Sequence, residues 1–358
     1  MASDVTRTKI LLLGLRRSGK SSIVQTLFHN LPPKQTFYLE PTLRIEKITY
    51  DTVIPLEIWD CPGNITLESL KPLAQFRTII FVIDIRDILK QAIAKLVDFV
   101  ITIHDQNPGA HFEIFVHKVE RLQEDDKLES FRQIEARVSD SLFEHSSDFT
   151  QLPFAAQMTS VYDHSLHRAF SKVLLKLVGL LPYLEELLNV FCSNSQSPKA
   201  FLFDVQSRLY IATDASPVDD ATHDLCSDYL RMLNAFGPLY KYVILQHTFV
   251  LGAQLFEARH KTIEPTSPSA ASEEADGRPA TRRRRKELFY PSGAALLHSS
   301  APGTTLTYHL ITEHLALLAV IPTAVFESRR GLIEYNVVHF REGVQEIYEV
   351  EQQVRGGS

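Results

Sequence analysis

Residues 10–22 read Ile10-Leu-Leu-Leu-Gly14-Leu-Arg16-Arg17-Ser18-Gly19-Lys20-Ser21-Ser22. In this stretch an apolar run enters the pattern Gly-x-x-x-x-Gly-Lys-Ser, and a segment that can form a helix follows. The glycines let the backbone bend so that successive N–H groups face one point, and the helix beginning near Lys20 adds the positive end of its dipole. The stretch therefore predicts a P-loop, which is a socket for the phosphates of a nucleoside triphosphate.

Two side chains carry the chemistry of this loop. The ammonium of Lys20 would reach the β- and γ-phosphates, and the hydroxyl of Ser21 would ligate Mg²⁺. The alternative is a glycine-containing loop without any ligand. We disfavour it because the motif stands where its mechanism requires, between an apolar strand and a helix.

The composition is that of an ordinary globular protein with room for two cores. The chain has 358 residues, of which 44% are hydrophobic and 22% charged, and its net charge of −6 gives no reason to expect a nucleic-acid partner. Its 3 cysteines suit reduced thiols of the cytoplasm. The longest apolar run, 315–326, is too short to span a bilayer, and neither end has a lipidation motif. We expect no direct membrane insertion, so that any membrane residence comes through a partner.

Strands and helices alternate in the first half of the chain. We expect strands over 9–13, 43–50, 53–59, 78–83, 112–117 and 154–158, and helices over 21–28, 88–104, 125–143 and 165–178. The two strands around 50–52 read as a hairpin. This alternation predicts an α/β domain over 1–182, with a mostly parallel sheet and helices on both of its faces.

The pattern changes from about residue 183. We expect helices over 184–191 and 329–350, strands over 199–205, 208–213, 293–299, 305–313 and 315–321, and two helices within 219–255 that break at Gly237-Pro238. This predicts a second α/β domain with an antiparallel sheet over 183–350, and then a tail over 351–358. Residues 261–287 are rich in Pro, Ser, Ala and Glu and hold a basic run, so we expect a disordered insertion.

A P-loop also occurs in kinases and ATPases, so other residues must decide the class. Asp60-Cys-Pro-Gly63 stands at the end of an expected strand, where Asp60 can hold Mg²⁺ through water and the Gly63 N–H can meet a γ-phosphate. Thr42, in the loop upstream, can ligate the same Mg²⁺, and Thr36 in that loop is a further candidate contact. Alone, Asp-x-x-Gly is a common turn and a loop threonine is usually solvated. In this order after a P-loop they predict a switch that senses the γ-phosphate.

The residues after the strand 112–117 predict the choice of base. His117-Lys118-Val-Glu120 stands where such folds read the base, and a carboxylate there can accept from the N1–H and amino group of guanine while the Lys118 stem covers the ring. The usual pattern is Asn-Lys-x-Asp, so this chain departs from it at both ends. Ser160 and Val161 can offer backbone N–H groups to the guanine O6.

Asn64 is the candidate that orients the attacking water, together with Lys20 on the phosphates. Hydrolytic GTPases commonly have Gln at this place, and Asn is shorter by one methylene. We therefore expect slow hydrolysis without an activating protein. The alternative is that the loop rearranges so that Asn64 substitutes adequately.

Together these motifs resemble those of a Rag GTPase. The resemblance rests on 14–22, 59–63, 117–120 and 162–165, and it continues through 187–191, 193–195, 199–205 and 210–219. The pair Arg16-Arg17 within the P-loop indicates the RagC/RagD subclass. The resemblance covers about 8–350 except the insertion, and Asn64 and Glu120 depart from the expected Gln and Asp.

The resemblance implies more than the residues themselves do. It implies a Ras-like G domain followed by a roadblock-type domain, GTP/GDP and Mg²⁺ as ligands, and a heterodimer with a RagA/RagB-like subunit. It also implies docking at the vacuole or lysosome on a Ragulator/EGO-type lipidated scaffold, a GTPase-activating protein, and amino-acid signalling to the TOR kinase complex, with the GDP form of this subunit activating. The competing interpretation is a scaffold that binds nucleotide without cycling and serves only dimerisation and docking.

Overall fold

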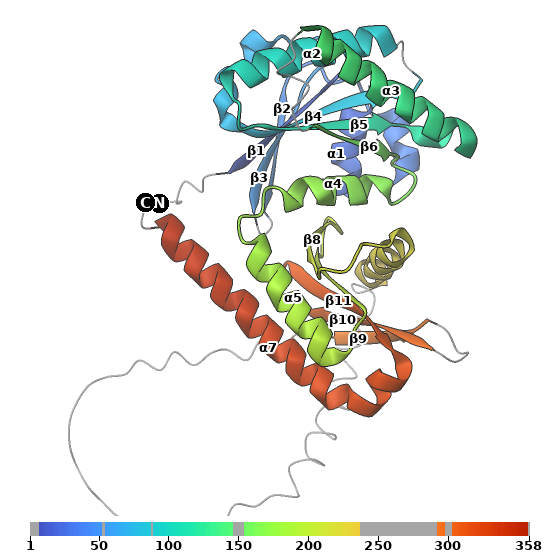
Figure 1. The fold of residues 1–358 in the computed structure, drawn as a ribbon, viewed down its shortest axis with the longest axis vertical. Helices are drawn as coiled ribbons and strands as arrows, with labels where there is room; N and C mark the ends of the chain where they lie inside the picture. The colour runs from blue at the N-terminus through green and yellow to red at the C-terminus, as the bar shows by residue number, and fades with distance from the viewer. Residues whose placement is uncertain are drawn as a thin grey trace, which may run out of the picture.

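Two β-sheets organise the chain, one in each half (Figure 1). The computed structural model describes residues 7–51, 54–86, 89–145, 154–236, 292–297 and 303–356. The first sheet has 6 strands in the order β2-β3-β1-β4-β5-β6, and the second has 5 in the order β8-β7-β11-β10-β9. This is the predicted arrangement of a Ras-like G domain followed by a roadblock-type domain.

The first sheet is parallel except at one edge, where β2 and β3 form an antiparallel hairpin. Its strands are β1 (Thr8–Gly14), β2 (Glu46–Asp51), β3 (Pro55–Asp60), β4 (Phe76–Asp84), β5 (His111–His117) and β6 (Phe154–Thr159). The central strands β1, β4 and β5 are buried along most of their length, as expected for a sheet covered on both faces.

The helices of the first half divide between the two faces of this sheet. They are α1 (Lys20–Phe28), α2 (Leu89–Gln106), α3 (Glu124–His145) and α4 (Ser165–Leu175). Alternate residues of β1 separate the two cores: Ile10 and Leu12 pack with α1 and α4, whereas Leu11 and Leu13 pack with α2 and α3. Short 3-10 turns connect these elements over Pro33–Tyr38, Leu67–Leu70, Leu73–Gln75 and Val119–Arg121.

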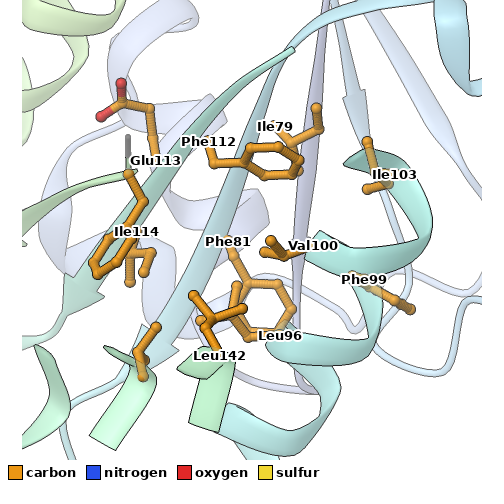
Figure 2. Close-up of a pocket in the computed structure, with 12 residues that line it drawn as sticks. Ile79, Phe81, Leu96, Phe99, Val100, Ile103, Phe112, Glu113, Ile114 and Leu142 are labelled. Carbon is orange, nitrogen blue, oxygen red and sulfur yellow. The ribbon is translucent and has the colours of Figure 1, made fainter. Parts of the chain in front are cut away.

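A small apolar cavity lies between α2, α3 and the sheet (Figure 2). Its volume is about 10 Å³, and side chains such as Phe81, Leu96 and Val100 line it. Glu113 points away from these side chains in Figure 2, and its carboxylate pairs with Lys176. A cavity of this size and polarity has no room for a nucleotide, so a ligand site has to lie elsewhere.

The second sheet is antiparallel throughout. It consists of β7 (Lys199–Asp204), β8 (Tyr210–Thr213), β9 (Ser292–Leu296), β10 (Thr304–Leu310) and β11 (Leu315–Pro322). The helices α5 (Leu181–Ser195) and α7 (Thr323–Gly356) pack against each other and against one face, and a helix over 220–236 covers the other.

The two halves share one apolar core and a set of polar contacts. Residues of α1, β2 and α4 belong to the same buried cluster as residues of α5, β7 and β8. The buried Tyr50 hydroxyl on β2 donates to Asp204 Oδ1 at 2.6 Å, and Arg168 on α4 pairs with Asp220 at 3.4 Å. Polar contacts thus link β2 to the second sheet and α4 to the helix over 220–236.

The expected elements are present, with differences at their ends. Pro182 lies in the first turn of α5, where the missing N–H of proline leaves no hydrogen bond unmade. The predicted boundary at 182/183 therefore falls inside a helix. The closing helix begins at Thr323 rather than at 329 and changes direction at Arg329, whose φ of −125° and ψ of 21° are not helical.

Some expectations fall outside the described residues. These are the second helix of 219–255 and the insertion over 261–287 with its basic run. Within the described part of the chain, no helix combines the length and the apolar character needed to cross a bilayer.

Candidate functional site

The phosphate loop connects β1 to α1 in a conformation that needs glycine. Gly14 and Gly19 have φ of 144° and 108°. A Cβ on Gly14 would lie 2.3 Å from the Val82 carbonyl oxygen, and one on Gly19 would lie 2.5 Å from the ring of His117. Side chains at these places would therefore both strain the backbone and collide with β4 or β5. Arg17 has a positive φ of 65° as well, which turns the backbone between the glycines.

Lys20 lies under this loop. Its side chain is buried, and its ammonium donates to the carbonyls of Gly14 at 3.1 Å and Leu15 at 3.0 Å. Burial is the main cause that lowers the pKa of Lys20 to about 8, against the raising effect of the Asp60 carboxylate and with smaller lowering effects of Lys95 and Lys118. A buried ammonium with a lowered pKa is stabilised in its charged form when an anion binds beside it.

Three oxygen-bearing side chains from separate loops meet at the carboxyl edge of the sheet. The Ser21 hydroxyl lies 2.5 Å from Asp60 Oδ2 and 2.7 Å from the Thr42 hydroxyl, and Thr42 donates to the same Asp60 oxygen at 3.3 Å. The other oxygen of Asp60 is buried and has no hydrogen-bond partner among the described residues. Burial raises the pKa of this carboxyl group.

This set of atoms fits Mg²⁺. Mg²⁺ prefers oxygen ligands and is usually held by one or two carboxylates together with the phosphates of its substrate. Asp60 supplies a carboxylate with an unused buried oxygen, and Ser21 and Thr42 supply hydroxyls. The described residues contain no group of three or more His, Cys, Asp or Glu suited to a metal, so a cation here would depend on the phosphates for further ligands.

The loop after β3 rests on the phosphate loop. A Cβ on Gly63 would lie 2.3 Å from the Arg16 nitrogen and 2.6 Å from its Cα, so only glycine allows this approach. The Gly63 carbonyl accepts a hydrogen bond from Lys95 of α2 at 2.7 Å. Asn64 follows directly and is exposed. The predicted phosphate sensor and the predicted water-orienting residue are therefore next to the predicted phosphate loop.

The motif His117-Lys118-Val-Glu120, which begins at the last residue of β5, contacts the phosphate loop. His117 is fully buried, its Nδ1 lies 3.0 Å from the Thr159 hydroxyl, and burial lowers its pKa to about 3, so the ring is neutral. Lys118 donates to the Arg17 carbonyl at 2.5 Å and to Asp84 at 2.7 Å. The hydrogen bond between His117 and Thr159 thus supports the structure of the site.

Glu120 keeps an unused acceptor. Its Oε2 is buried without a hydrogen-bond partner in the described part of the chain, and its Oε1 is 3.9 Å from Arg121. Of the two backbone N–H groups expected to face a base, that of Ser160 already donates to the Ser165 hydroxyl at 2.9 Å. This leaves Val161 as the backbone donor of the pair.

The remaining candidates differ in their exposure and in their distance from the site. Arg16 and Arg17 are exposed, Ser22 is half-buried, and the buried Ser18 hydroxyl has no partner among the described atoms. The Thr36 hydroxyl donates to the Pro33 carbonyl at 2.7 Å, within its own 3-10 turn, so the structure does not bring it to the Ser21 group.

Two supporting residues, Asp84 and Lys95, carry no prediction from the sequence. Asp84 ends β4 at the same edge as the motif loops, and its place at a strand end was the available signal. Lys95 lies in the middle of α2, where a lone lysine carries no local signal.

A phosphate loop before α1, a threonine before β2, Asp-x-x-Gly after β3 and a base-reading motif after β5 define the class of P-loop G proteins. The chain matches the family model "Gtr1/RagA G protein conserved region" over residues 9–230. It is 36% identical over 358 residues to Ras-related GTP-binding protein C of Mus musculus, covering 97% of this chain and 79% of that protein. It is also 34% identical over 348 residues to GTP-binding protein gtr2 of Schizosaccharomyces pombe (95% and 98% covered) and 31% identical over 357 residues to GTP-binding protein GTR2 of Saccharomyces cerevisiae (97% and 95%). The chain belongs to the Gtr1/RagA family of G proteins, as a GTPase of the RagC/Gtr2 type.

Proposed function

We propose that this chain binds GTP and GDP with Mg²⁺ at the carboxyl edge of the first sheet and acts as a molecular switch. The convergence of Ser21, Thr42 and Asp60 beside the phosphate loop carries this proposal, because it unites the two sensing loops and the P-loop at one point. Thr42 and Gly63 would sense the γ-phosphate, since Thr42 bonds to Ser21 at the end of the P-loop and Gly63 lies against Arg16 within it.

The roles in GTP hydrolysis follow from the positions of the side chains. Lys20 would leave its carbonyl partners and bind the terminal phosphates. When bound, Mg²⁺ would offset negative charge on the phosphates. Asn64, exposed at the end of the sensing loop, would orient the attacking water, and its short side chain makes slow turnover expected in the absence of a GTPase-activating protein. Glu120, through its unused oxygen, would select guanine.

Nucleotide titration tests the site. Lys20→Ala and Ser21→Asn should weaken GTP binding most, because these residues meet the terminal phosphates and the metal. Lys90→Ala is a matched control, since Lys90 is an exposed lysine outside the site. Equal GTP affinity of Lys20→Ala and the parent would refute the assignment. Single-turnover hydrolysis in the same samples separates a cycling GTPase from a scaffold that only binds nucleotide.

We further propose that the second half of the chain forms a heterodimer with a RagA/RagB-like subunit. The helix over 220–236 buries one face on the sheet, and a separate face exposes Leu225, Met232 and Phe236 by 38%, 44% and 51%. These residues recur at the spacing of a helix stripe. β9 is an edge of the sheet in the part of the chain that the structure describes, and its side chains are alternately exposed. An apolar stripe and an open strand edge favour a partner of like fold.

Charged substitutions in this stripe test the heterodimer. Met232→Asp combined with Phe236→Asp should abolish co-purification with a RagA/RagB-like subunit while guanine-nucleotide binding persists. Leu128→Asp on α3 is the control, because Leu128 is 45% exposed and outside the stripe. Undiminished recovery of the partner with the double variant would place the dimer contact elsewhere.

The cellular role belongs to the same proposal and rests on the resemblance to Rag GTPases. The heterodimer would dock on a Ragulator/EGO-type lipidated scaffold at the cytoplasmic face of the vacuole or lysosome and relay amino-acid sufficiency to the TOR kinase complex. Loss of vacuolar or lysosomal recruitment in the double variant, with normal recruitment of the control, is the result that supports it.

A further inference from the structure

A lysine outside the recognised motifs holds the sensing loop. Lys95 lies on α2, and its ammonium donates to the Gly63 carbonyl at 2.7 Å. The same ammonium lies 5.3 Å from the centre of the Phe99 ring, within the distance of a cation–π contact. Lys95 and Gly63 are 32 positions apart in the sequence. The packing of α2 on the sheet therefore determines where the lysine holds the sensing loop.

The charge of Lys95 has no carboxylate partner in the described part of the chain within salt-bridge distance, whereas lysines such as Lys118 and Lys176 do. Partial burial lowers the pKa of Lys95, which indicates that the ammonium is held at some expense of hydration. A partly desolvated cation bonded to a single backbone carbonyl is not explained as a stabilising ion pair.

The position of that carbonyl gives the lysine a role. The Gly63 carbonyl belongs to the peptide whose N–H is that of Asn64, the proposed water-orienting residue. On its other side Gly63 lies against Arg16 of the phosphate loop, so closely that no side chain fits between them. The peptide between Gly63 and Asn64 is therefore held between α2 and the phosphate loop.

We infer that Lys95 is a positioning residue for GTP hydrolysis, which fixes the Gly63–Asn64 peptide so that Asn64 faces the γ-phosphate. This inference rests on the proposed function of the site. The ammonium also polarises the peptide it binds, which strengthens the N–H of Asn64 as a donor. Because Lys95 bonds to a backbone carbonyl, the role requires a long cationic side chain at position 95. It does not depend on a side chain at position 63, which is glycine.

Single-turnover hydrolysis by the full-length protein tests the inference. Lys95→Met keeps the apolar stem and removes the donor, so it should reduce the hydrolysis rate by about 10- to 100-fold, the range expected when a hydrogen bond from a charged group is lost. Its affinity for GDP should stay within about threefold of the parent, because Lys95 contacts neither the metal ligands nor the base-reading residues. Lys95→Arg should restore most of the rate, and Lys90→Met, an exposed lysine of the same helix, should have none of these effects.

The outcomes are distinguishable. If the parent binds GTP and Lys95→Met hydrolyses it as fast as the parent does, the positioning role is overturned while the proposed function stands. Equal loss of nucleotide affinity and rate in Lys95→Met would also overturn it, because it would show a general effect on the site. A parent that binds no guanine nucleotide would refute the proposed function and the positioning role with it.

Discussion

The bond between Tyr50 and Asp204 makes a testable contribution to stability. Tyr50 is 7% exposed, and its hydroxyl donates to Asp204 Oδ1 at 2.6 Å, linking β2 to the second sheet. Tyr50→Phe removes only the hydroxyl and keeps the ring, which packs on Phe28 with 4.8 Å between the ring centres. Hydrogen bonds to charged groups contribute about 1.5 to 3 kcal/mol. Asp204 Oδ1 keeps two donors from Ser207, at 2.8 Å and 2.6 Å, so we expect about 1.5 kcal/mol, at the lower end of that range.

Urea unfolding followed by circular dichroism and by tryptophan fluorescence measures this effect. The single tryptophan, Trp59, lies in β3, so fluorescence reports on the first half of the chain, whereas circular dichroism reports on both halves. Tyr183→Phe is the control, since Tyr183 is 61% exposed. A free energy of unfolding within about 0.5 kcal/mol of the parent, the usual spread of surface substitutions, would refute the view that this bond joins the two halves.

Three further predictions concern the nucleotide site. GTP affinity should be about fourfold lower at pH 8.5 than at pH 7, because Lys20, with a pKa of about 8 in the free protein, must take up a proton to bind the phosphates. Calorimetry in two buffers checks the proton uptake. An equal pH dependence of GTP affinity in Lys20→Ala would contradict this prediction. Asn64→Gln should accelerate hydrolysis without an activating protein severalfold, since the longer amide reaches further toward the water; an unchanged single-turnover rate would show that side-chain length is not limiting. Glu120→Asn should shift binding from guanine toward xanthine nucleotides, whose O2 carbonyl accepts from the new amide; competition by ATP equal to that by GTP in the parent would show that Glu120 does not read the base.

The sequence predicted the first half well because its signals are local. The P-loop glycines, the apolar runs of β1 and β4 and the Asp60–Gly63 turn each carry their own pattern, and the order of strands and helices then fixes a parallel sheet. The meeting of Ser21, Thr42 and Asp60 followed from the same order, since Ser21 lies in the first turn of the helix after β1, Thr42 in the loop before β2 and Asp60 at the end of β3.

Contacts between distant segments could not be read in this way. Lys95 reaches Gly63 only because α2 packs across the sheet, and Tyr50 meets Asp204 only because the second sheet packs below β2. Neither contact leaves a periodic or motif signal in the chain. The start of α7 was placed too late for a different reason, because the bend at Arg329 separates its first turns from the apolar pattern that follows.

The nucleotide that accompanies the purified protein tests the central claim most directly. The full-length parent is purified in Mg²⁺ buffer and denatured, and the released nucleotide is identified by chromatography, with Ser21→Asn treated in parallel. The account predicts a guanine nucleotide in near-stoichiometric amount from the parent and a loss of the triphosphate form from the variant, because Ser21 is a proposed ligand of the metal. Release of adenine nucleotides, or of no nucleotide from a folded parent that also fails to take up added GTP, would contradict it.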